Sequence, residues 1–359
     1  MRIFFLSLTL IGLLVPSVAT AQTPPEDIAS TFEAFWTLFD QRYASFEEKQ
    51  IDWQKVYQEY RPKVSELQTE RELFDLMTDI LRPFRDAHIN LLARSIDTAF
   101  TARRPSRIIE ELRPIPSKER RSSFQAMTAQ SLRENGFGPL TEIGPEYKGR
   151  KLFAYTNNGK VGYLRFTRSF KGGSFFQFWS LNKMLNKIFS TFQGLDGLII
   201  DIRFNMGGND SFSQKVAGRL IREKTVAYYK QTRKDKAFGP LEAKYIKPRG
   251  KATFDNPVVL LTNDKTVSAA DVLALISHSL PQITLLGEPS NGSFSDLLSK
   301  KLPNKWTITL SHQRYLSTDK VNYEGRGVPV DEKVLDTLQG VQNKKDAVLL
   351  KALEKLQSD

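Results

Sequence analysis

The sequence contains no cysteine, and this absence removes several classes of function at once. Without cysteine the chain has no disulfide framework, no thiolate nucleophile and no cysteine that could carry a lipid anchor. Histidine is almost as scarce, at three residues in 359. Because those three are scattered along the chain, they form no ligand cluster, and the sequence implies neither a metal site nor an organic cofactor.

Long apolar runs are also rare, and the one at the N-terminus is typical of an export signal. Arg2 supplies a positive charge, the apolar run IFFLSLTLIGLLV follows, and ATA precedes Gln22. This order predicts a secretory signal peptide over residues 1–21, cleaved after Ala21 and too short to span a bilayer with a stop-transfer flank. No later run is long enough to cross a membrane. We therefore expect a periplasmic or secreted protein without a membrane span, and a cytoplasmic protein with a misread leader is the alternative.

Positive charge exceeds negative charge, giving a formal net charge of +12. The basic residues gather in RRPSRIIEELRPIPSKERR (103–121) and KYIKPRGK (244–251). Such clusters could meet an anionic membrane face, acidic peptides or nucleic acid. Aromatic residues do not alternate with these clusters as a base-stacking platform would require. We therefore interpret them as a solvated basic face, and nucleic-acid binding is not predicted.

The order of predicted elements divides the chain after the signal into four parts. Apolar residues with a helical period predict an N-terminal helical domain over residues 22–88, in which the aromatic side chains form core. Residues 89–160 are an irregular connecting region with short strands at INLLAR and LFAYT. Residues 161–340 alternate strand and helix, which predicts parallel crossovers and a three-layer α/β core. Residues 341–359 form a C-terminal helix.

One strand-to-helix junction of this core, in LTNDKTVSAADVLALISHSL (261–280), carries Ser268 at the start of a predicted helix. Asp271 follows three residues later, which is the spacing of a capping box, and a cap alone would explain the serine. The position also suits a nucleophile, because function in α/β sheets collects where strands end and helices begin. Both interpretations stand at this point.

A second junction, DIRFNMGGND (201–210), places Gly207 and Gly208 after a buried strand. Adjacent glycines let a backbone approach a ligand closely and leave N–H groups uncovered at a helix N-terminus. Those donors, together with the amide of Ala269, would suit a developing oxyanion. An ordinary tight turn is the alternative for a glycine pair taken alone.

A serine hydroxyl needs a base to accept its proton, and the three histidines are the candidates. His278 follows Ser268 on the same predicted helix by ten residues, about 15 Å along the axis, and cannot reach it. His312 alternates with apolar residues on one face of a strand-like run, which indicates packing. His88, in RPFRDAHINL with Asp86 beside it, is the remaining candidate, although a histidine in such a loop is often structural.

Together these segments resemble one family, the tail-specific (C-terminal-processing) and tricorn-type serine peptidases. DIRFNMGG is similar to its Asp-x-Arg-x-Asn-x-Gly-Gly motif, and the segment from LTNDKTVSAAD to GEPSNG is similar to its nucleophile helix and the following Gly-Glu strand. RDAH resembles its short Asp-x-His motif, and NYEGRGVPVDEKV (322–334) its closing Glu-x-x-Gly-Val stretch. The N-terminal FWTLFDQRYASF is typical of its bacterial members. The resemblance spans most of residues 28–334.

The resemblance implies a ClpP/crotonase-like α/β core, here preceded by a helical domain, and peptide hydrolysis through a serine acyl-enzyme. Ser268 is then the nucleophile, and the amides near Gly207, Gly208 and Ala269 form the oxyanion hole. No PDZ domain is predicted, because residues 89–160 are short for one and lack a Gly-rich carboxylate-binding loop.

The two branches of this family use different residues as the general base that activates the serine. In the tail-specific branch a lysine serves, at the position that Ser293 holds here. In the tricorn-like branch a histidine near the start of the core serves, supported by a glutamate of the closing motif, and His88 and Glu324 match these positions. That branch has a serine directly before its histidine, whereas this chain has Ala87. Asp86 and Ser293 are the candidate supporting residues.

The first hypothesis is therefore an exported serine endopeptidase of the tricorn-like branch that acts on extended or unfolded peptides. From a different class, the alternative is a catalytically retired member that binds peptides or apolar ligands, which Ala87 and the missing lysine favour. A purely structural interpretation, with one capped helix and two ordinary turns, leaves the order of the four motifs unexplained. The sequence carries no indication of the oligomeric state.

Overall fold

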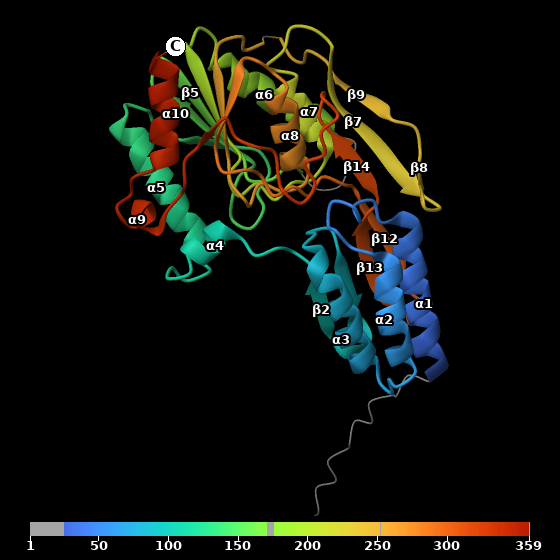
Figure 1. Cartoon of the computed structure of the whole chain (residues 1–359). Helices are drawn as coiled ribbons and strands as arrows, with labels where there is room; N and C mark the ends of the chain where they lie inside the picture. Colours follow the sequence, from blue (N-terminus) through green and yellow to red (C-terminus); the bar gives the residue numbers. More distant parts are fainter. Residues whose placement is uncertain (1–24, 171–175, 252, 359) are drawn as a thin grey trace, which may run out of the picture.

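The computed structural model describes residues 25–170, 176–251 and 253–358, so the predicted signal peptide lies outside the described residues. Figure 1 shows a smaller part, in which helices lie beside a small sheet, and a larger part built around a sheet with helices on both faces. An extended segment after β2 (Thr98–Thr101) leads from the smaller part to the larger.

The smaller part begins with three helices, as the apolar pattern predicted. They are α1 (Pro25–Arg42), α2 (Trp53–Val64) and α3 (Glu70–Leu81). Their buried aromatic residues share one core with Ile308 of a four-stranded antiparallel sheet and with Trp306, which directly precedes the strand of Ile308. The order of that sheet is β12 (Leu297–Lys301), β13 (Thr307–Ser311), β1 (Asn90–Ala93) and β2. A segment from late in the sequence therefore completes the N-terminal part.

The connecting region contains two helices that the sequence pattern did not indicate. They are α4 (Arg107–Glu111) and α5 (Arg120–Glu134), and they follow a short helical turn, η2 (Arg94–Ile96). Two strands follow, β3 (Thr141–Ile143) and β4 (Phe153–Asn157), and they form the antiparallel edge of the larger sheet. The connecting region is therefore shared, because β1 and β2 belong to the sheet of the smaller part, whereas β3 and β4 belong to the larger sheet.

The larger sheet has seven strands in the order β15-β11-β10-β6-β5-β4-β3. Five neighbouring strands are parallel: β15 (Glu332–Lys333), β11 (Ile283–Gly287), β10 (Val258–Thr262), β6 (Gly197–Asp201) and β5 (Val161–Arg165). Helices α6 (Phe176–Ser190), α7 (Asp210–Ala217) and α8 (Ala269–His278) lie in the crossovers. The predicted alternation of strand and helix is therefore confirmed.

Successive side chains of these strands point to opposite faces of the sheet, as a pleated backbone requires. Leu198 and Ile200 pack with residues of α6, α7 and α8. Ile199 packs on the other face with Leu132 of α5 and with α10 (Ala347–Ser358). Figure 1 shows these helices on the two sides of the sheet. The three-layer prediction is confirmed.

This topology places the two junctions singled out in the sequence next to each other. Strands β6 and β10 are hydrogen-bonded neighbours, with Ile200 opposite Leu260, and both run in the same direction. The carboxyl ends of both strands, and the turns that lead into α7 and α8, therefore meet at one edge of the sheet.

The remaining elements lie around the core. A third sheet joins β7 (Thr225–Lys234) to β8 (Ala237–Phe238), β9 (Glu242–Ile246) and β14 (Gln313–Leu316). A short helix, α9 (Leu338–Gln342), precedes α10. Among the described residues, none of the helices combines the length and the apolar character that crossing a membrane requires.

Candidate active site

Ser268 lies directly before α8 in a backbone conformation that differs from those of Asp52, Thr69 and Asn209, which cap other described helices. Its φ is 63° and its ψ is −124°, in a region that favours glycine and strains any residue with a β carbon. The caps Asp52, Thr69 and Asn209 are extended, with negative φ, as side-chain caps ordinarily are. A serine held at about 1–3 kcal/mol of backbone strain indicates a role beyond capping.

Gly207 lies against this serine so closely that no other residue fits. A β carbon on Gly207 would lie 2.4 Å from the carbonyl oxygen of Val267 and 2.6 Å from the β carbon of Ser268. Asn205 joins the two turns, because its carbonyl oxygen accepts the amide of Val267 at 2.9 Å. Its side chain also donates to the carbonyl oxygen of Phe166 at 2.9 Å. The glycine turn and the serine turn are thus one structural unit.

Two of the three predicted oxyanion donors, Gly208 and Ala269, have backbone N–H groups that donate no hydrogen bond among the described residues. The N–H of Gly207 donates to Oδ1 of Asn205 at 2.9 Å and is therefore occupied. Within the described part of the chain, the N–H groups of Gly208 and Ala269 make no hydrogen bond. Ala269 opens α8, where a helix leaves its amides without intrahelical partners. Gly208 and Ala269 are thus available to a developing negative charge beside Ser268.

Asp271 holds the start of α8 against the loop that follows β11. Its carboxylate accepts the amides of Ser268 at 2.6 Å, Gly292 at 2.7 Å and Ser293 at 3.2 Å. Burial raises the pKa of Asp271 to about 6, although these donors oppose the shift. Ser293, at the position of the family's lysine, is buried and donates its hydroxyl to Oδ1 of Asn291 at 2.8 Å. Ser293 is therefore held in the loop that Asp271 joins to the serine turn.

Glu324 approaches the same region through Phe294, whose amide donates to its Oε2 at 3.1 Å. The other oxygen, Oε1, is buried without a hydrogen bond among the described residues, and Nζ of Lys49 lies 3.8 Å from it. Burial, and then the charge of Asp86, raise the pKa of Glu324 to about 8. The carboxyl group is therefore protonated at neutral pH.

His88 is buried in the loop between α3 and β1. Its Nδ1 lies 3.5 Å from Oγ of Ser311 on β13. Burial lowers the pKa of His88, while Asp86 opposes the shift, so the imidazole is neutral at pH 7, as a general base must be. Asp86 accepts the backbone amide of His88 at 2.8 Å and the hydroxyl of Tyr43 at 3.1 Å. It thus supports the loop and makes no hydrogen bond to the ring.

The structure brings together Ser268, Ala269 and the two glycines, and it connects Ser293 to them through Asp271. His88 and Glu324 share the neighbours Asp86 and Lys49. Across the described residues, no hydrogen bond joins His88 to Ser268 or to Glu324. Three residues of this region, Asn205, Ser311 and Lys49, were not predicted from the sequence; only Asn205 had a signal there, as the Asn of DIRFNMGG.

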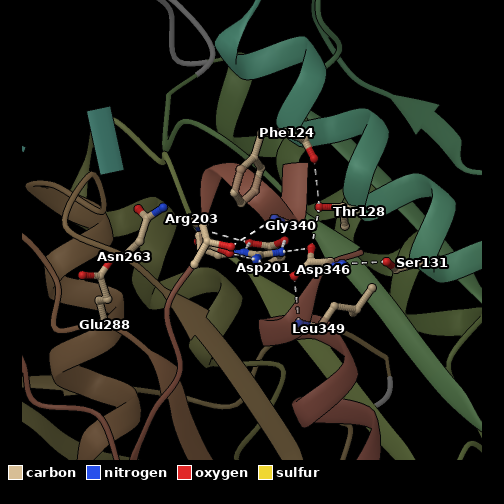
Figure 2. Close-up of polar contacts among 12 residues, drawn as sticks. Phe124, Thr128, Ser131, Asp201, Arg203, Asn263, Glu288, Gly340, Asp346 and Leu349 are labelled. Atoms are coloured by element: carbon tan, nitrogen blue, oxygen red, sulfur yellow. Dashed lines mark hydrogen bonds and ion pairs between the residues drawn. The ribbon is translucent and has the colours of Figure 1, made fainter. Parts of the chain in front are cut away.

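Figure 2 shows the surroundings of Arg203, the second charged residue of DIRFNMGG. Its guanidinium group pairs with Asp201 at 2.7 Å, Asp336 at 2.8 Å and Asp346 at 2.8 Å. The hydroxyl of Thr128 on α5 donates to Asp346 at 2.7 Å. Burial raises the pKa of Asp336 to about 7, which limits the excess of negative charge around one arginine. This buried cluster fixes the strand end before the glycine turn to α5 and α10.

Metal chemistry has no visible centre in the described residues, which contain no group of three or more histidine and acidic side chains placed to hold an ion. The available chemistry is that of a hydroxyl on a strained turn, two free amides, a neutral imidazole and a protonated carboxyl group.

Comparisons with known proteins relate the chain to peptidases. Residues 160–334 match the model of peptidase family S41, and residues 24–82 match the tricorn protease C1 domain. A carboxyl-terminal-processing protease of Synechocystis sp. is 33% identical over 100 residues, which cover 28% of this chain and 22% of that protein. The carboxy-terminal processing protease CtpA of Bacillus subtilis is 28% identical over 130 residues, 35% of this chain and 26% of that protein. The matches thus span about a quarter of each relative.

A crystal structure from Parabacteroides merdae, described as that of a candidate peptidase, shares the fold over 93% of this chain and 97% of its own, with a TM-score of 0.73 and 24% sequence identity. This similarity confirms the predicted α/β fold with its N-terminal helices. The family matches and the partial relatives make the chain similar to serine-type peptidases. More particularly, residues 160–334 are similar to peptidase family S41, and residues 24–82 are similar to the C1 domain of the tricorn protease.

Proposed function

We propose that the protein is an exported serine endopeptidase that hydrolyses extended or unfolded peptides through an acyl-enzyme on Ser268. The observation that carries the proposal is the conformation of this serine. Its φ of 63° is held against Gly207, beside two uncommitted amides. Strained residues of this kind cluster at active sites, where the surrounding structure over-determines them.

In the proposed reaction, Oγ of Ser268 attacks the carbonyl carbon of the scissile bond while His88 accepts the hydroxyl proton. The oxyanion that forms accepts hydrogen bonds from the amides of Gly208 and Ala269. The intermediate then expels the amine, which takes the proton from His88 and leaves an ester on Ser268. Water attacks this ester while His88 accepts one of its protons. The bond to Oγ of Ser268 then breaks, His88 returns the proton to that oxygen, and the second peptide product leaves as a carboxylic acid.

The remaining predicted residues have positioning roles in this proposal. Ser311 offers a hydroxyl to Nδ1 of His88 at 3.5 Å, which Ala87 cannot do. Glu324 offers a buried oxygen that makes no hydrogen bond among the described residues and lies 3.8 Å from Nζ of Lys49, a neighbour that it shares with His88. Because His88 and Ser268 share no hydrogen bond, the proposal requires substrate binding to bring them into contact, and catalytic hydrogen bonds are often long without substrate.

Export is part of the proposal and rests on the signal-like residues 1–21, which favour a periplasmic or secreted location. The peptide would bind in an extended form, as an added strand, because the turns around Ser268 continue strand ends that carry free backbone donors. In this proposal Gly207 and Gly208 allow the backbone of the peptide to approach the backbone of the glycine turn closely.

A second candidate function is that of a catalytically retired member that binds peptides or apolar ligands without cleaving them. The missing contact between His88 and Ser268 favours it, as does Ala87. The two functions differ in what Ser268 does. A binding protein keeps its affinity when the hydroxyl is removed, whereas a hydrolase loses turnover.

The experiment is hydrolysis of an unfolded, fluorescently labelled casein by the mature chain, Ser268→Ala and His88→Ala. We expect turnover by the parent and losses of at least about a hundredfold in both variants, since general bases contribute about 10²–10⁴ to the rate. His278→Ala is the matched control, because this residue lies at the far end of α8. Turnover that is equal in the parent and Ser268→Ala contradicts the proposal.

A further inference from the structure

A cavity of about 330 Å³ is bordered by the connecting region and by the segment that leads to the glycine turn. Phe204 and Met206 line it, and Met206 is the residue directly before Gly207. Thr167 lines it from the other side, and its carbonyl oxygen accepts the amide of Met206 at 3.1 Å. The cavity wall is therefore continuous with the turn that lies against Ser268.

The distance from this cavity to the candidate nucleophile is small. The α carbons of Met206 and Gly207 are about 3.8 Å apart, as for any adjacent residues, and Gly207 lies in contact with Ser268. Lys265, which also lines the cavity, precedes Ser268 by three residues. A peptide whose scissile bond lies at Ser268 would thus have neighbouring side chains within reach of the cavity.

The cavity is lined by an unusual number of cations. Seven of its lining residues are basic: Lys118, Arg120, Arg121, Lys148, Arg150, Arg168 and Lys265. None of these seven forms an ion pair with a carboxylate of the described residues. Arg168 is buried, yet its guanidinium group donates to the carbonyl oxygens of Arg150 and Pro145 rather than to an acid.

The carboxylates near this cavity form hydrogen bonds or ion pairs with residues other than the seven basic lining residues. Asp264 accepts the hydroxyl of Ser106 at 3.0 Å and the backbone amide of Arg107. Glu146 pairs with Lys151. Burial lowers the pKa of Lys265, and burial followed by repulsion from Arg150 lowers the pKa of Arg121. Such positive charge without an internal counter-charge contrasts with Arg203, which has three carboxylates around it.

We propose that this basic pocket binds acidic side chains of the substrate, so that the peptidase prefers peptides with Asp or Glu beside the scissile bond. The inference rests on the proposed function only for the position of that bond. Carboxylates match the donor set, because charge-assisted hydrogen bonds to Arg and Lys are the strongest that a peptide can offer here. A single C-terminal carboxylate would leave most of the seven cations unpaired, which favours several acidic side chains.

Binding tests the pocket without requiring turnover. The protein is the mature chain with Ser268→Ala, and the probes are three labelled peptides of equal length, followed by fluorescence anisotropy. The first carries four Glu and an amidated C-terminus, the second carries four Gln and an amidated C-terminus, and the third carries four Gln and a free C-terminus. We expect the first to bind at least about tenfold more tightly than the other two, from one or more charge-assisted hydrogen bonds.

The variant Arg121→Gln with Arg150→Gln should remove most of this preference, because both residues line the cavity and neither holds a carboxylate of the protein. Lys160→Gln with Lys187→Gln is the matched control, since it removes two exposed lysines that do not line the cavity. Equal affinity for the first two peptides overturns the inference. So does a preference for the free C-terminus alone, and so does a preference that the control pair abolishes equally.

Turnover of the same peptides by the parent separates the two proposals. If the acidic peptide binds more tightly but none is cleaved, the pocket stands and the proposed peptidase function fails. If all are cleaved at equal kcat/KM and bind equally, the function stands and the pocket fails. If the acidic peptide is both bound and cleaved preferentially, and 0.5 M salt reduces that preference, both stand, because salt screens exposed charge pairs.

Discussion

Replacing Ser268 by glycine should stabilise the protein, which is the opposite of what a helix cap predicts. The φ of 63° and ψ of −124° strain a residue with a β carbon by about 1–3 kcal/mol, and glycine relieves that strain. Glycine also gives the unfolded chain more freedom, which offsets about 0.4–1 kcal/mol. The net expectation is a gain of about 1 kcal/mol in the free energy of unfolding.

Ser268→Ala keeps the β carbon and therefore the strain, so its free energy of unfolding should stay within about 0.5 kcal/mol of the parent. Both variants should lose hydrolysis. The assay is equilibrium unfolding in urea, followed by circular dichroism, and the glycine variant should unfold at a midpoint higher by a few tenths of a molar unit, at about 2 kcal/mol per molar.

Thr337 is the matched control, since it caps α9 in the same part of the chain with φ of −128° and accepts the amide of Gly340 at 3.0 Å. Thr337→Ala should lose about 1 kcal/mol, and Thr337→Gly a few tenths. If Ser268→Ala loses as much as Thr337→Ala and Ser268→Gly gains nothing, Ser268 is a cap and the reasoning is wrong.

Three further predictions concern the residues around this turn. Gly207→Ala should reduce hydrolysis by at least about a hundredfold and destabilise the fold by about 1–3 kcal/mol, because its β carbon would lie 2.4 Å from a backbone oxygen; unchanged kcat/KM would contradict the contact. Arg203→Met should lower the free energy of unfolding in urea by about 3–5 kcal/mol, since it leaves buried aspartates without a counter-charge; a neutral effect would refute that role. Glu324 binds its proton more tightly in the folded state, with a pKa of about 8 against an ordinary 4.5. Its contribution to stability is therefore greatest below pH 4.5 and is lost as the pH rises through 8, and Glu324→Gln should flatten this decline in urea midpoints between pH 5 and 9.

The fold could largely be predicted because its signals are local. The strand–helix alternation after residue 160 and the apolar stripe of α1 both follow from periods that a short window reveals. Helix α5 was not predicted, because its buried face mixes Phe124 and Met127 with Thr128 and Ser131, so the apolar residues show no clear helical period. The pairing of strands that are distant in the sequence could not be predicted for a different reason. Leu91 lies opposite Ile308, and no local pattern identifies so distant a partner.

Some features of the candidate site could likewise be predicted from the sequence, and others could not. The glycine pair and Ser268 were visible as turns, and the parallel neighbours β6 and β10 place them together. The strain at Ser268 is a backbone angle that residue types do not encode. The occupied amide of Gly207 depends on the orientation of Asn205, and the partner of His88 is a hydroxyl on β13. These details arise only when distant segments pack.

Intact-mass labelling with a fluorophosphonate probe tests most directly whether Ser268 is an activated nucleophile with His88 as its base. The parent, Ser268→Ala and His88→Ala would be compared, with circular dichroism to establish that each is folded. We predict one adduct on the parent and none on either variant. An adduct that persists in Ser268→Ala, or a folded parent that takes up no probe even with an unfolded peptide present, would contradict the account.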